Sequence, residues 1–313
     1  MPPDTAASPT PKPETPPLST PNSPSASPTT PLSSPSSTRS PPTKQQPTLL
    51  FACARLINGT PTDFPQFRTT LLDQWHDITP QMQQRRTQTN EPARCAPLYP
   101  LLSALPQPLA LIEVGASAGL CLYPDRYAYD YDGTTTGDST SPVQISCSTR
   151  GPQPPTGHRL RIASRIGIDL TPLDVRDRDN TNWLRALIWP EHHDRTARLN
   201  AAIDIAAADP PRLIQGDLNE RLPEAVAAAP DDATIVVFHT AVMPYLPQWE
   251  RHCFVEQTRH LGVRWIAQET PKALPHITAP DPDPRTGSVH LLSQDERPIA
   301  HTAPHGDWIH WFN

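Results

Sequence analysis

The stretch LIEVGASAGLCLYPDRY, residues 111–127, decides how this chain is interpreted. It begins inside an apolar run, residues 109–114, that ends at Gly115, a pattern typical of a strand buried on both faces of a parallel sheet. Similar strand patterns recur at 165–170, 212–217, 234–239 and 263–268, with helical patterns at 183–189, 195–208 and 248–260. Strands that alternate with helices predict an α/β fold built on a doubly wound, mostly parallel sheet.

The C-terminal part departs from this alternation. Residues 288–293 and 307–312 resemble two strands with no helix between them, and a proline-rich loop, residues 271–284, precedes them. We therefore expect an antiparallel pair at one edge of the sheet. Five parallel strands closed by an antiparallel pair is the architecture of class I methyltransferases.

The segments ahead of and inside this sheet predict a domain order. Residues 1–48 contain 15 prolines and little apolar surface, so we expect a disordered tail. Amphipathic helical patterns then predict a helical cap over 49–108, before a Rossmann-like domain over 109–313. Within that domain we expect an insertion, 127–160, containing a hairpin: Tyr127, Tyr129 and Tyr131 alternate, Asp132-Gly133 is a turn signal, and 143–147 resembles the returning strand.

The composition limits the partners and the compartment. The net charge is −6 and no basic stripe is present, which does not favour nucleic acid as a partner. No apolar run has the length of a signal peptide or membrane helix, so we expect a cytoplasmic protein without a membrane partner. The five cysteines are scattered and contain no C-x-x-C, which predicts reduced thiols and no metal site.

The turn after the first strand has two interpretations. Gly115-Ala116-Ser117-Ala118-Gly119 fits G-x-S-x-G, the turn that presents the nucleophilic serine of α/β-hydrolases. Asp217 and His305 follow Ser117 in the order that a hydrolase triad requires. However, such a turn normally comes after several strands, whereas here it would follow the first one, with no oxyanion loop upstream.

The second interpretation is a cofactor turn for S-adenosylmethionine. Glu113 would organise the loop, and Gly115, Ala116, Ser117 and Gly119 would form the floor below the cofactor, because glycine allows close approach of the backbone. The N-terminus of a following helix would offer free N–H groups to the cofactor carboxylate. Asp169 suits the ribose diol and Asp217 the adenine amine, at the carboxyl ends of the second and third strands.

Two residues are candidates for the chemistry of methyl transfer. His239 ends the fourth strand and could remove a proton near neutral pH, and Glu269, after the fifth strand, is a second candidate base. Residues 189–195 form either a charged loop or a substrate-binding lip. The acceptor would be a small molecule or a protein, and a module that binds the cofactor without catalysis stays an open alternative.

The segments around these residues resemble a known family. TNEPARCAPLYPLL (89–102), LIEVGASAGLCLYPDRYAYDY (111–131), RIGIDLTPLDV (165–175), NWLRALIWPEHHDRTARLNAA (182–202), LIQGDLNERLP (213–223), TIVVFHTAVMPYL (234–246) and HGDWIHW (305–311) resemble the bacterial proteins grouped as domain of unknown function 2332. This family looks like a divergent relative of S-adenosylmethionine-dependent methyltransferases, and the resemblance implies that fold and cofactor. The chain departs from the methyltransferase pattern at Ser117, where a glycine is usual, and at His239, where the fourth strand often ends in Asp or Asn.

Overall fold

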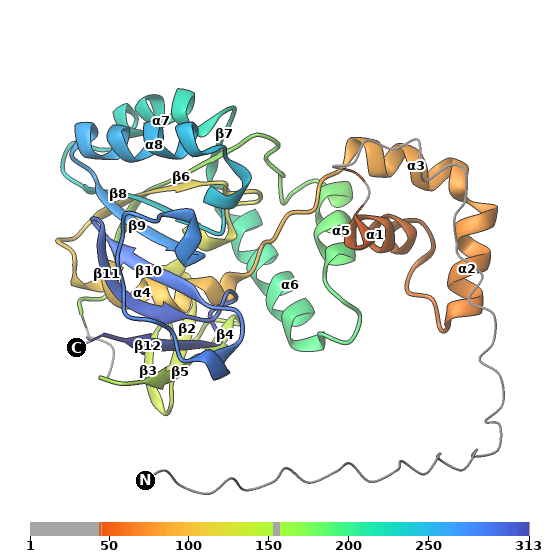
Figure 1. Ribbon diagram of the computed structural model, residues 1–313, viewed down its shortest axis with the longest axis horizontal. Helices are drawn as coiled ribbons and strands as arrows, with labels where there is room; N and C mark the ends of the chain where they lie inside the picture. Colours follow the sequence, from red (N-terminus) through yellow and green to blue (C-terminus); the bar gives the residue numbers. More distant parts are fainter. Residues whose placement is uncertain (1–43, 45, 153–156, 313) are drawn as a thin grey trace, which may run out of the picture. The chain divides into compact units, whose positions relative to one another are not determined.

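The computed structural model describes residues 44, 46–152 and 157–312, all of which belong to one unit, Pro42–Asn313. The expected disordered tail, residues 1–48, lies mostly outside these residues. Within the described part, nine strands form one sheet in the order β5-β12-β11-β10-β9-β8-β1-β6-β7, and three more form a small second sheet (Figure 1). The protein is therefore a mixed α/β protein with a large sheet.

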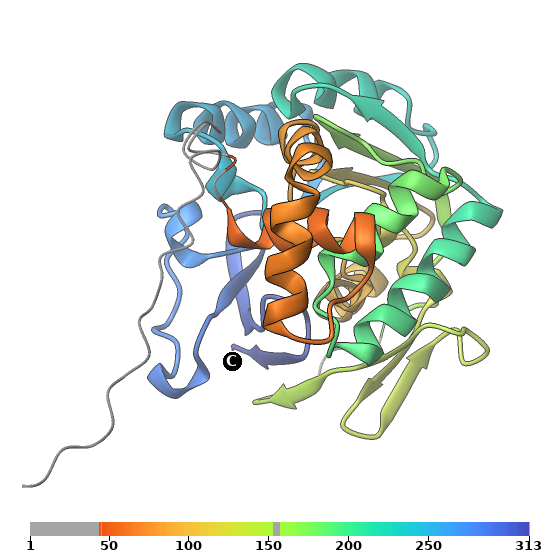
Figure 2. The same ribbon diagram turned by 90° about the vertical axis from the view of Figure 1, so that its right-hand side faces the viewer.

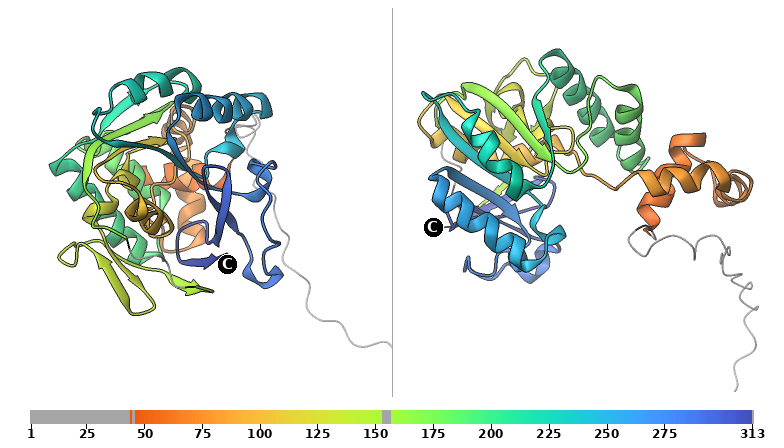
Figure 3. Two further views of the ribbon diagram at one scale, coloured as in Figure 1. Left: turned by 90° about the vertical axis from the view of Figure 1, so that its left-hand side faces the viewer. Right: turned by 90° about the horizontal axis from the view of Figure 1, so that it is seen from above.

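The N-terminal segment is helical up to the first strand, as expected from its amphipathic pattern. Its helices are α1 (Pro47–Asn58), α2 (Phe64–Asp73), α3 (Trp75–Gln84) and α4 (Cys95–Ala104), the last preceded by the 3-10 turn η3 (Pro92–Arg94). The backbone leaves the helical conformation at Gln74, which separates α2 from α3. Residues 85–91, between α3 and η3, form neither helix nor strand and carry the chain from one to the other (Figure 3).

Five neighbouring parallel strands form one side of the large sheet. They are β1 (Leu109–Val114), β6 (Ile162–Asp169), β7 (Arg212–Gln215), β8 (Thr234–Thr240) and β9 (Arg264–Glu269). Their spatial order is β7-β6-β1-β8-β9, so β1 lies between β6 and β8. The strands that follow β1 are added first on one side of it, as β6 and β7, and then on the other side, as β8 and β9, so the order of strand addition reverses at β1. In open α/β sheets this reversal is where ligands bind, outside the carboxyl ends of the strands.

Two apolar cores cover the two faces of this sheet. The helices after β6 are α5 (Arg178–Leu187), α6 (His193–Ala208), α7 (Leu218–Ala227) and α8 (Gln248–Leu261). Leu109 and Leu111 of β1 face the first core, with α4, α5 and α6, whereas Ile112 and Val114 face the second, with α7 and α8. This alternation follows from the two-residue period of a strand. Figure 2 shows the N-terminal helices, in orange, beside the green α5 and α6, and α1 packs against α5.

The C-terminal strands differ from the expected antiparallel pair. Three strands, β10 (His290–Gln294), β11 (Arg297–Thr302) and β12 (Trp308–Trp311), continue the sheet from β9 as an antiparallel meander. The sequence pattern did not predict β11, because Pro298 lies inside it and proline is rare within strands. The tight turn that leads into β11 uses Asp295 and Glu296, both with positive φ, instead of the usual Asn-Gly or Asp-Gly. As expected, 3-10 turns, η7 (Pro271–Ala273) and η8 (Pro284–Thr286), stand between β9 and β10 instead of an α-helix.

The segment between β1 and β6 contains the expected hairpin, with one correction. The turns η4 (Leu120–Leu122) and η5 (Pro124–Arg126) lead into β2 (Ala128–Tyr131), β3 (Thr134–Gly137), β4 (Gln144–Ser146) and β5 (Ser148–Arg150). The returning strand is β3, since the two-residue turn Asp132-Gly133 connects it directly to β2. The stretch 143–147, expected to return, instead forms β4, which pairs with β2 in parallel, and β5 joins the edge of the large sheet beside β12.

Candidate functional site

The residues expected to hold a cofactor lie at the carboxyl ends of three adjacent strands. Glu113 is the second-last residue of β1 and the turn 115–119 follows it, Asp169 is the last residue of β6, and Asp217 follows β7 as the N-cap of α7. Since β7, β6 and β1 are parallel neighbours, these carboxylates share one edge of the sheet. Gly115 is exposed there, and a side chain at this position would collide with Val242 in the loop after β8.

The backbone N–H groups of the turn are already used within the chain. Those of Gly115 and Ala116 donate to the carbonyl of Ile168, and that of Gly119 donates to Ala116. The N–H groups of residues 117 and 118 donate to side-chain oxygens, at 2.8 and 3.0 Å. The turn leads into the 3-10 helix η4 rather than an α-helix. The sequence predicted that free N–H groups of a helix would bind the cofactor carboxylate. This turn has no such free N–H groups among residues 115–119.

The two aspartates stabilise the loops in which they stand. Asp169 accepts hydrogen bonds from the backbone N–H of Ser117 at 2.8 Å and from that of Thr171, also at 2.8 Å. Asp217 caps α7 by accepting from the N–H of Asn219 at 2.8 Å. Each carboxylate oxygen can accept a second hydrogen bond, so these contacts do not prevent either residue from binding a ligand hydroxyl or amine.

Ser117 does not have the surroundings of a nucleophile. It is buried, with a positive φ of 52°, and its Oγ accepts a hydrogen bond from the side-chain amide of Asn90 at 2.6 Å. Asn90 also accepts from the N–H of Ala118, so it holds both sides of the turn. Asp217, the acid of the triad considered from the sequence, caps α7 instead of orienting a histidine.

Replacing Ser117 with alanine is expected to leave any activity of the protein intact and to lower the free energy of unfolding by about 1 kcal/mol, the value of one hydrogen bond. A serine-directed fluorophosphonate should not label the wild-type protein at this position, which intact mass spectrometry would measure. Stoichiometric labelling that disappears in the Ser117→Ala variant would contradict this assignment and support the hydrolase.

The two candidate bases lie on the opposite face of the sheet from Glu113. In the register between β1 and β8, Glu113 pairs with Phe238, which belongs to the first core. His239, one residue further, points into the second core, where its ring packs edge-on against Phe254 of α8. Successive side chains of a strand point to opposite faces, so Glu113 and His239 cannot act on one reacting atom through the sheet.

His239 has both ring nitrogens occupied. The indole N–H of Trp265 donates to its Nε2 at 3.0 Å, and because this nitrogen accepts, the ring proton is on Nδ1, which donates to Glu269 Oε1 at 2.7 Å. The same oxygen of Glu269 accepts from the N–H groups of Val242 and Met243. Burial raises the pKa of Glu269, but these hydrogen bonds outweigh it and the net pKa is lowered. This arrangement positions the loop after β8 and leaves His239 without a free nitrogen for a substrate proton.

The pKa of Glu113 is shifted in the opposite direction from that of Glu269. Glu113 is 4% exposed and its Oε2 has no hydrogen-bond partner among the described residues. Burial, followed by the neighbouring Cys121, raises its pKa well above the usual value, and the opposing effect of Arg94 is smaller. A raised pKa favours the protonated form of the carboxyl group, which can donate a hydrogen bond.

Replacing Glu113 with glutamine, which has the shape of the protonated side chain, is expected to remove the contribution of this carboxyl group to the pH dependence of stability. Above the unfolded pKa of about 4.5, the unfolded wild-type chain releases this proton while the raised folded pKa favours its retention, so the contribution of Glu113 to stability falls as pH rises, by up to about 1.4 kcal/mol per pH unit. Urea unfolding at pH 5, 6 and 7 should therefore show a growing advantage for Glu113→Gln. A constant difference across this range would contradict the raised pKa.

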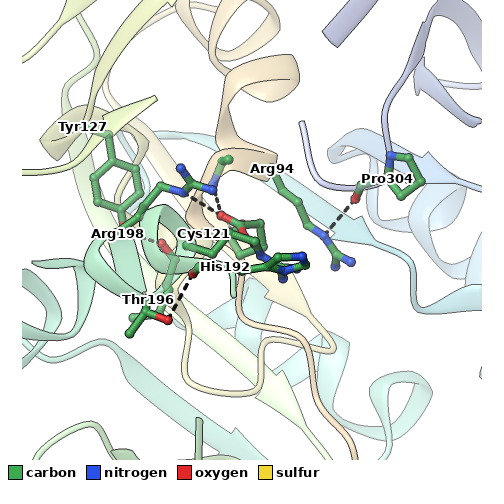
Figure 4. Close-up of polar contacts among 11 residues, drawn as sticks. Arg94, Cys121, Tyr127, His192, Thr196, Arg198 and Pro304 are labelled. Carbon is green, nitrogen blue, oxygen red and sulfur yellow. Dashed lines mark hydrogen bonds and ion pairs between the residues drawn. The ribbon is translucent and has the colours of Figure 1, made fainter. Parts of the chain in front are cut away.

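A group of buried charges lies next to Glu113, and the sequence did not predict that its members come together. We call it the Arg94 cluster, and its members are Glu91, Arg94, Glu113, Arg195, Arg198, Glu269, His290 and His305. Arg94, only 6% exposed, donates to the carbonyl oxygen of Pro304 at 3.1 Å (Figure 4) and to that of Thr240 at 3.0 Å. These contacts connect η3 to the end of β8 and to the turn between β11 and β12.

Glu91 anchors the α6 side of this cluster. Its carboxylate accepts from Arg195 Nε at 2.6 Å and from Arg198 Nε at 2.8 Å, and also from the N–H of Ala93. Burial raises its pKa, but the two arginines and the backbone contact together lower it, so the carboxylate stays charged. Residues 189–195, considered from the sequence as a charged loop or a lip, thus contribute Arg195 to the cluster.

Two histidines complete the cluster on the C-terminal side. Burial, with a further contribution from Arg94, lowers the pKa of His290 to about 4, although Glu269 opposes this. Burial, followed by Arg195 and Arg94, likewise lowers the pKa of His305 to about 4. Both rings are therefore neutral at pH 7, and each has an Nδ1 without a partner among the described residues.

The aromatic residues of the insertion pack the fold. Tyr127, Tyr129 and Tyr131 are all buried, and their hydroxyl groups donate to the carbonyl oxygens of residues 120, 124 and 96. The structure has an apolar cavity of about 340 Å³ between α1 and residues 186–191, which Trp189 lines, and a larger one of about 670 Å³ between α8 and residues 272–276. None of the three tyrosines lines either cavity. None of the residues expected to bind the cofactor lines either cavity.

Among the described residues, no three side chains of the His, Cys, Asp and Glu types are arranged to hold a metal ion. In the same part of the chain, no helix is long and apolar enough to cross a membrane.

The fold and the buried charges define the class of this protein. It is a mixed α/β protein with a buried polar cluster at the carboxyl ends of the parallel strands of its large sheet. The chain belongs to the family described as "Uncharacterized protein conserved in bacteria (DUF2332)", which matches residues 41–311. Neither the curated proteins nor the solved structures contain a significant match to it.

Proposed function

We propose that the carboxyl edge of β1, β6 and β7 binds S-adenosylmethionine and that the protein transfers its methyl group to a small-molecule or protein acceptor. The observation that carries this proposal is the alignment of Glu113, Asp169 and Asp217 along one edge, beside the exposed Gly115. The strand order around β1 supports it, because nucleotide-binding sheets place their ligand at this reversal.

The contacts with the cofactor would come from side chains rather than from the N–H groups of the turn. A ribose hydroxyl can donate to Asp169 and the adenine amine can donate to Asp217, since both carboxylates retain acceptor capacity. Two large apolar side chains in the neighbouring loops, Leu170 at 56% and Tyr245 at 84% exposed, are available to cover an adenine ring. Exposed apolar groups of this size often belong to binding surfaces.

An Asp217→Asn variant tests this proposal without disturbing α7, because asparagine caps a helix about as well as aspartate. The loss of the charge should weaken the binding of S-adenosylhomocysteine about tenfold in calorimetry, the difference between a charged and a neutral hydrogen bond. Asp63→Asn, at the N-cap of α2, is the matched control and should bind like wild type. Equal affinity of all three proteins would count against this edge as the binding site.

A second candidate function is a module that binds the cofactor without catalysis. The observation that favours it is the engagement of His239 and Glu269 with each other and with Trp265, which leaves no free base on that face. Turnover of labelled S-adenosylmethionine in the presence of cell extract separates the two functions, since a binding module would produce no S-adenosylhomocysteine.

A further inference from the structure

Four buried polar atoms around Arg94 have no hydrogen-bond partner among the described residues. They are Glu113 Oε2, Glu269 Oε2, His290 Nδ1 and His305 Nδ1. An unsatisfied buried polar atom costs about 1–3 kcal/mol, and native proteins contain few of them. Their side chains come from the ends of β1 and β9, the start of β10, and the turn between β11 and β12. Such a concentration at one place in the fold indicates that these groups serve a ligand.

The charges of the cluster favour an anion. Three arginines, Arg94, Arg195 and Arg198, stand against two carboxylates with lowered pKa values, Glu91 and Glu269. Burial raises the pKa of Glu113 well above its usual value, which favours its uncharged form, and both histidines, with pKa values of about 4, are neutral at pH 7. The cluster thus carries a net positive charge inside a chain whose overall charge is −6. Positive charge held in surroundings of low polarity attracts anions more strongly than it would at the surface.

The cluster can be reached from solvent on one side. The side chain of Arg195 is 23% exposed, and His305 and Pro304 are partly exposed. Arg94, in contrast, is buried behind them and is held in place by carbonyl oxygens, so its guanidinium is fixed before any ligand arrives. A buried, fixed guanidinium behind a partly exposed one is an arrangement suited to an oxyanion, which accepts hydrogen bonds from several donors.

We propose that the Arg94 cluster binds the oxyanion group of a small-molecule substrate, a carboxylate or a phosphate, between Arg94, Arg195 and His305. This names the class of acceptor for the methyl transfer proposed above and rests on that proposal for the reaction, whereas anion binding can be measured without the cofactor. Glu113, next to the cluster and to the cofactor edge, would stand between the two ligands.

Thermal unfolding of the full chain tests this inference at pH 7.5. Sodium phosphate and sodium acetate are titrated from 0 to about 20 mM, with sodium chloride holding the ionic strength constant, because salts that are excluded from protein surfaces raise stability without binding. Wild-type protein should show a saturating rise in Tm with at least one of the two anions. The response to acetate or to phosphate tells which oxyanion the site prefers.

Two variants at the site and one control localise this response. Arg195→Gln and His305→Gln should each lose the saturating rise; His305→Gln keeps the test valid if Arg195→Gln does not fold. Arg259→Gln, which removes a surface arginine paired with Glu256 and Glu296, should retain it. An identical response in chloride, or one that survives both site variants, would overturn the inference. S-adenosylhomocysteine binding that persists in Arg195→Gln shows that the cofactor edge is intact, so a failed anion response there does not count against the proposed function.

Discussion

Replacing Glu91 with glutamine is expected to lower the free energy of unfolding by about 3 kcal/mol. Glu91 is 2% exposed and its two oxygens each accept a hydrogen bond from an arginine, so the substitution leaves Arg195 and Arg198 without their counter-charge. Removal of one partner from a buried ion pair typically costs about 3–5 kcal/mol, and the partial exposure of the arginines places the effect at the lower end. Urea unfolding at pH 7 measures it.

The chain provides a matched control for this prediction. Glu224 also contacts two arginines, Arg212 at 3.1 Å and Arg221 at 3.4 Å, but its side chain is 45% exposed. Exposed ion pairs contribute about 0–1 kcal/mol, so Glu224→Gln should change stability little. If the two variants destabilise the protein equally, Glu91 is not buried between its arginines as the structure places it.

The second large effect is the loss of stability on acidification that His290 causes. Its folded pKa, about 4, lies below the usual value of 6.5, so the folded state favours the neutral ring. The contribution of the neutral His290 ring to the free energy of unfolding is fully present above pH 6.5. It is lost as pH falls towards the folded pKa, by about 3 kcal/mol between pH 6.5 and 4.

The difference between wild type and His290→Gln across this window isolates the effect, because Glu113, which acts in the opposite direction, is present in both proteins. His260→Gln, on the exposed end of α8, is the control and should follow wild type. Chemical unfolding at several pH values between 6.5 and 4 should show wild type losing stability relative to His290→Gln as pH falls. Parallel curves would mean that His290 is not buried as a neutral ring.

The central strands were predictable because their physical signal is local. Residues 109–114 form a short apolar run ended by glycine, and the structure has β1 over the same residues. The turn between β2 and β3 was predictable for the same reason, because Asp-Gly readily adopts the positive φ angles of a two-residue hairpin turn. α7 was missed because Pro223 lies inside it, and β11 because of Pro298, so in both places tertiary packing overrides a residue that usually interrupts the element.

The candidate site was predictable only in part. The acids at the carboxyl ends of β1, β6 and β7 followed from the strand pattern. The opposite faces of Glu113 and His239 could have been found from the two-residue period once the strand register was known, and that register is not a local property. The Arg94 cluster combines residues 91 to 305, and in the sequence its charges resemble those of any solvated surface.

Calorimetric titration of the full chain with S-adenosylhomocysteine at pH 7.5 tests the central claim most directly. The proposed function predicts one site per chain with a Kd in the micromolar range. It also predicts a higher Tm at about 1 mM ligand, since a 1,000-fold excess over Kd stabilises the folded state by about 4 kcal/mol. Absence of both heat and thermal shift, with S-adenosylhomocysteine and with S-adenosylmethionine at that concentration, would contradict the claim.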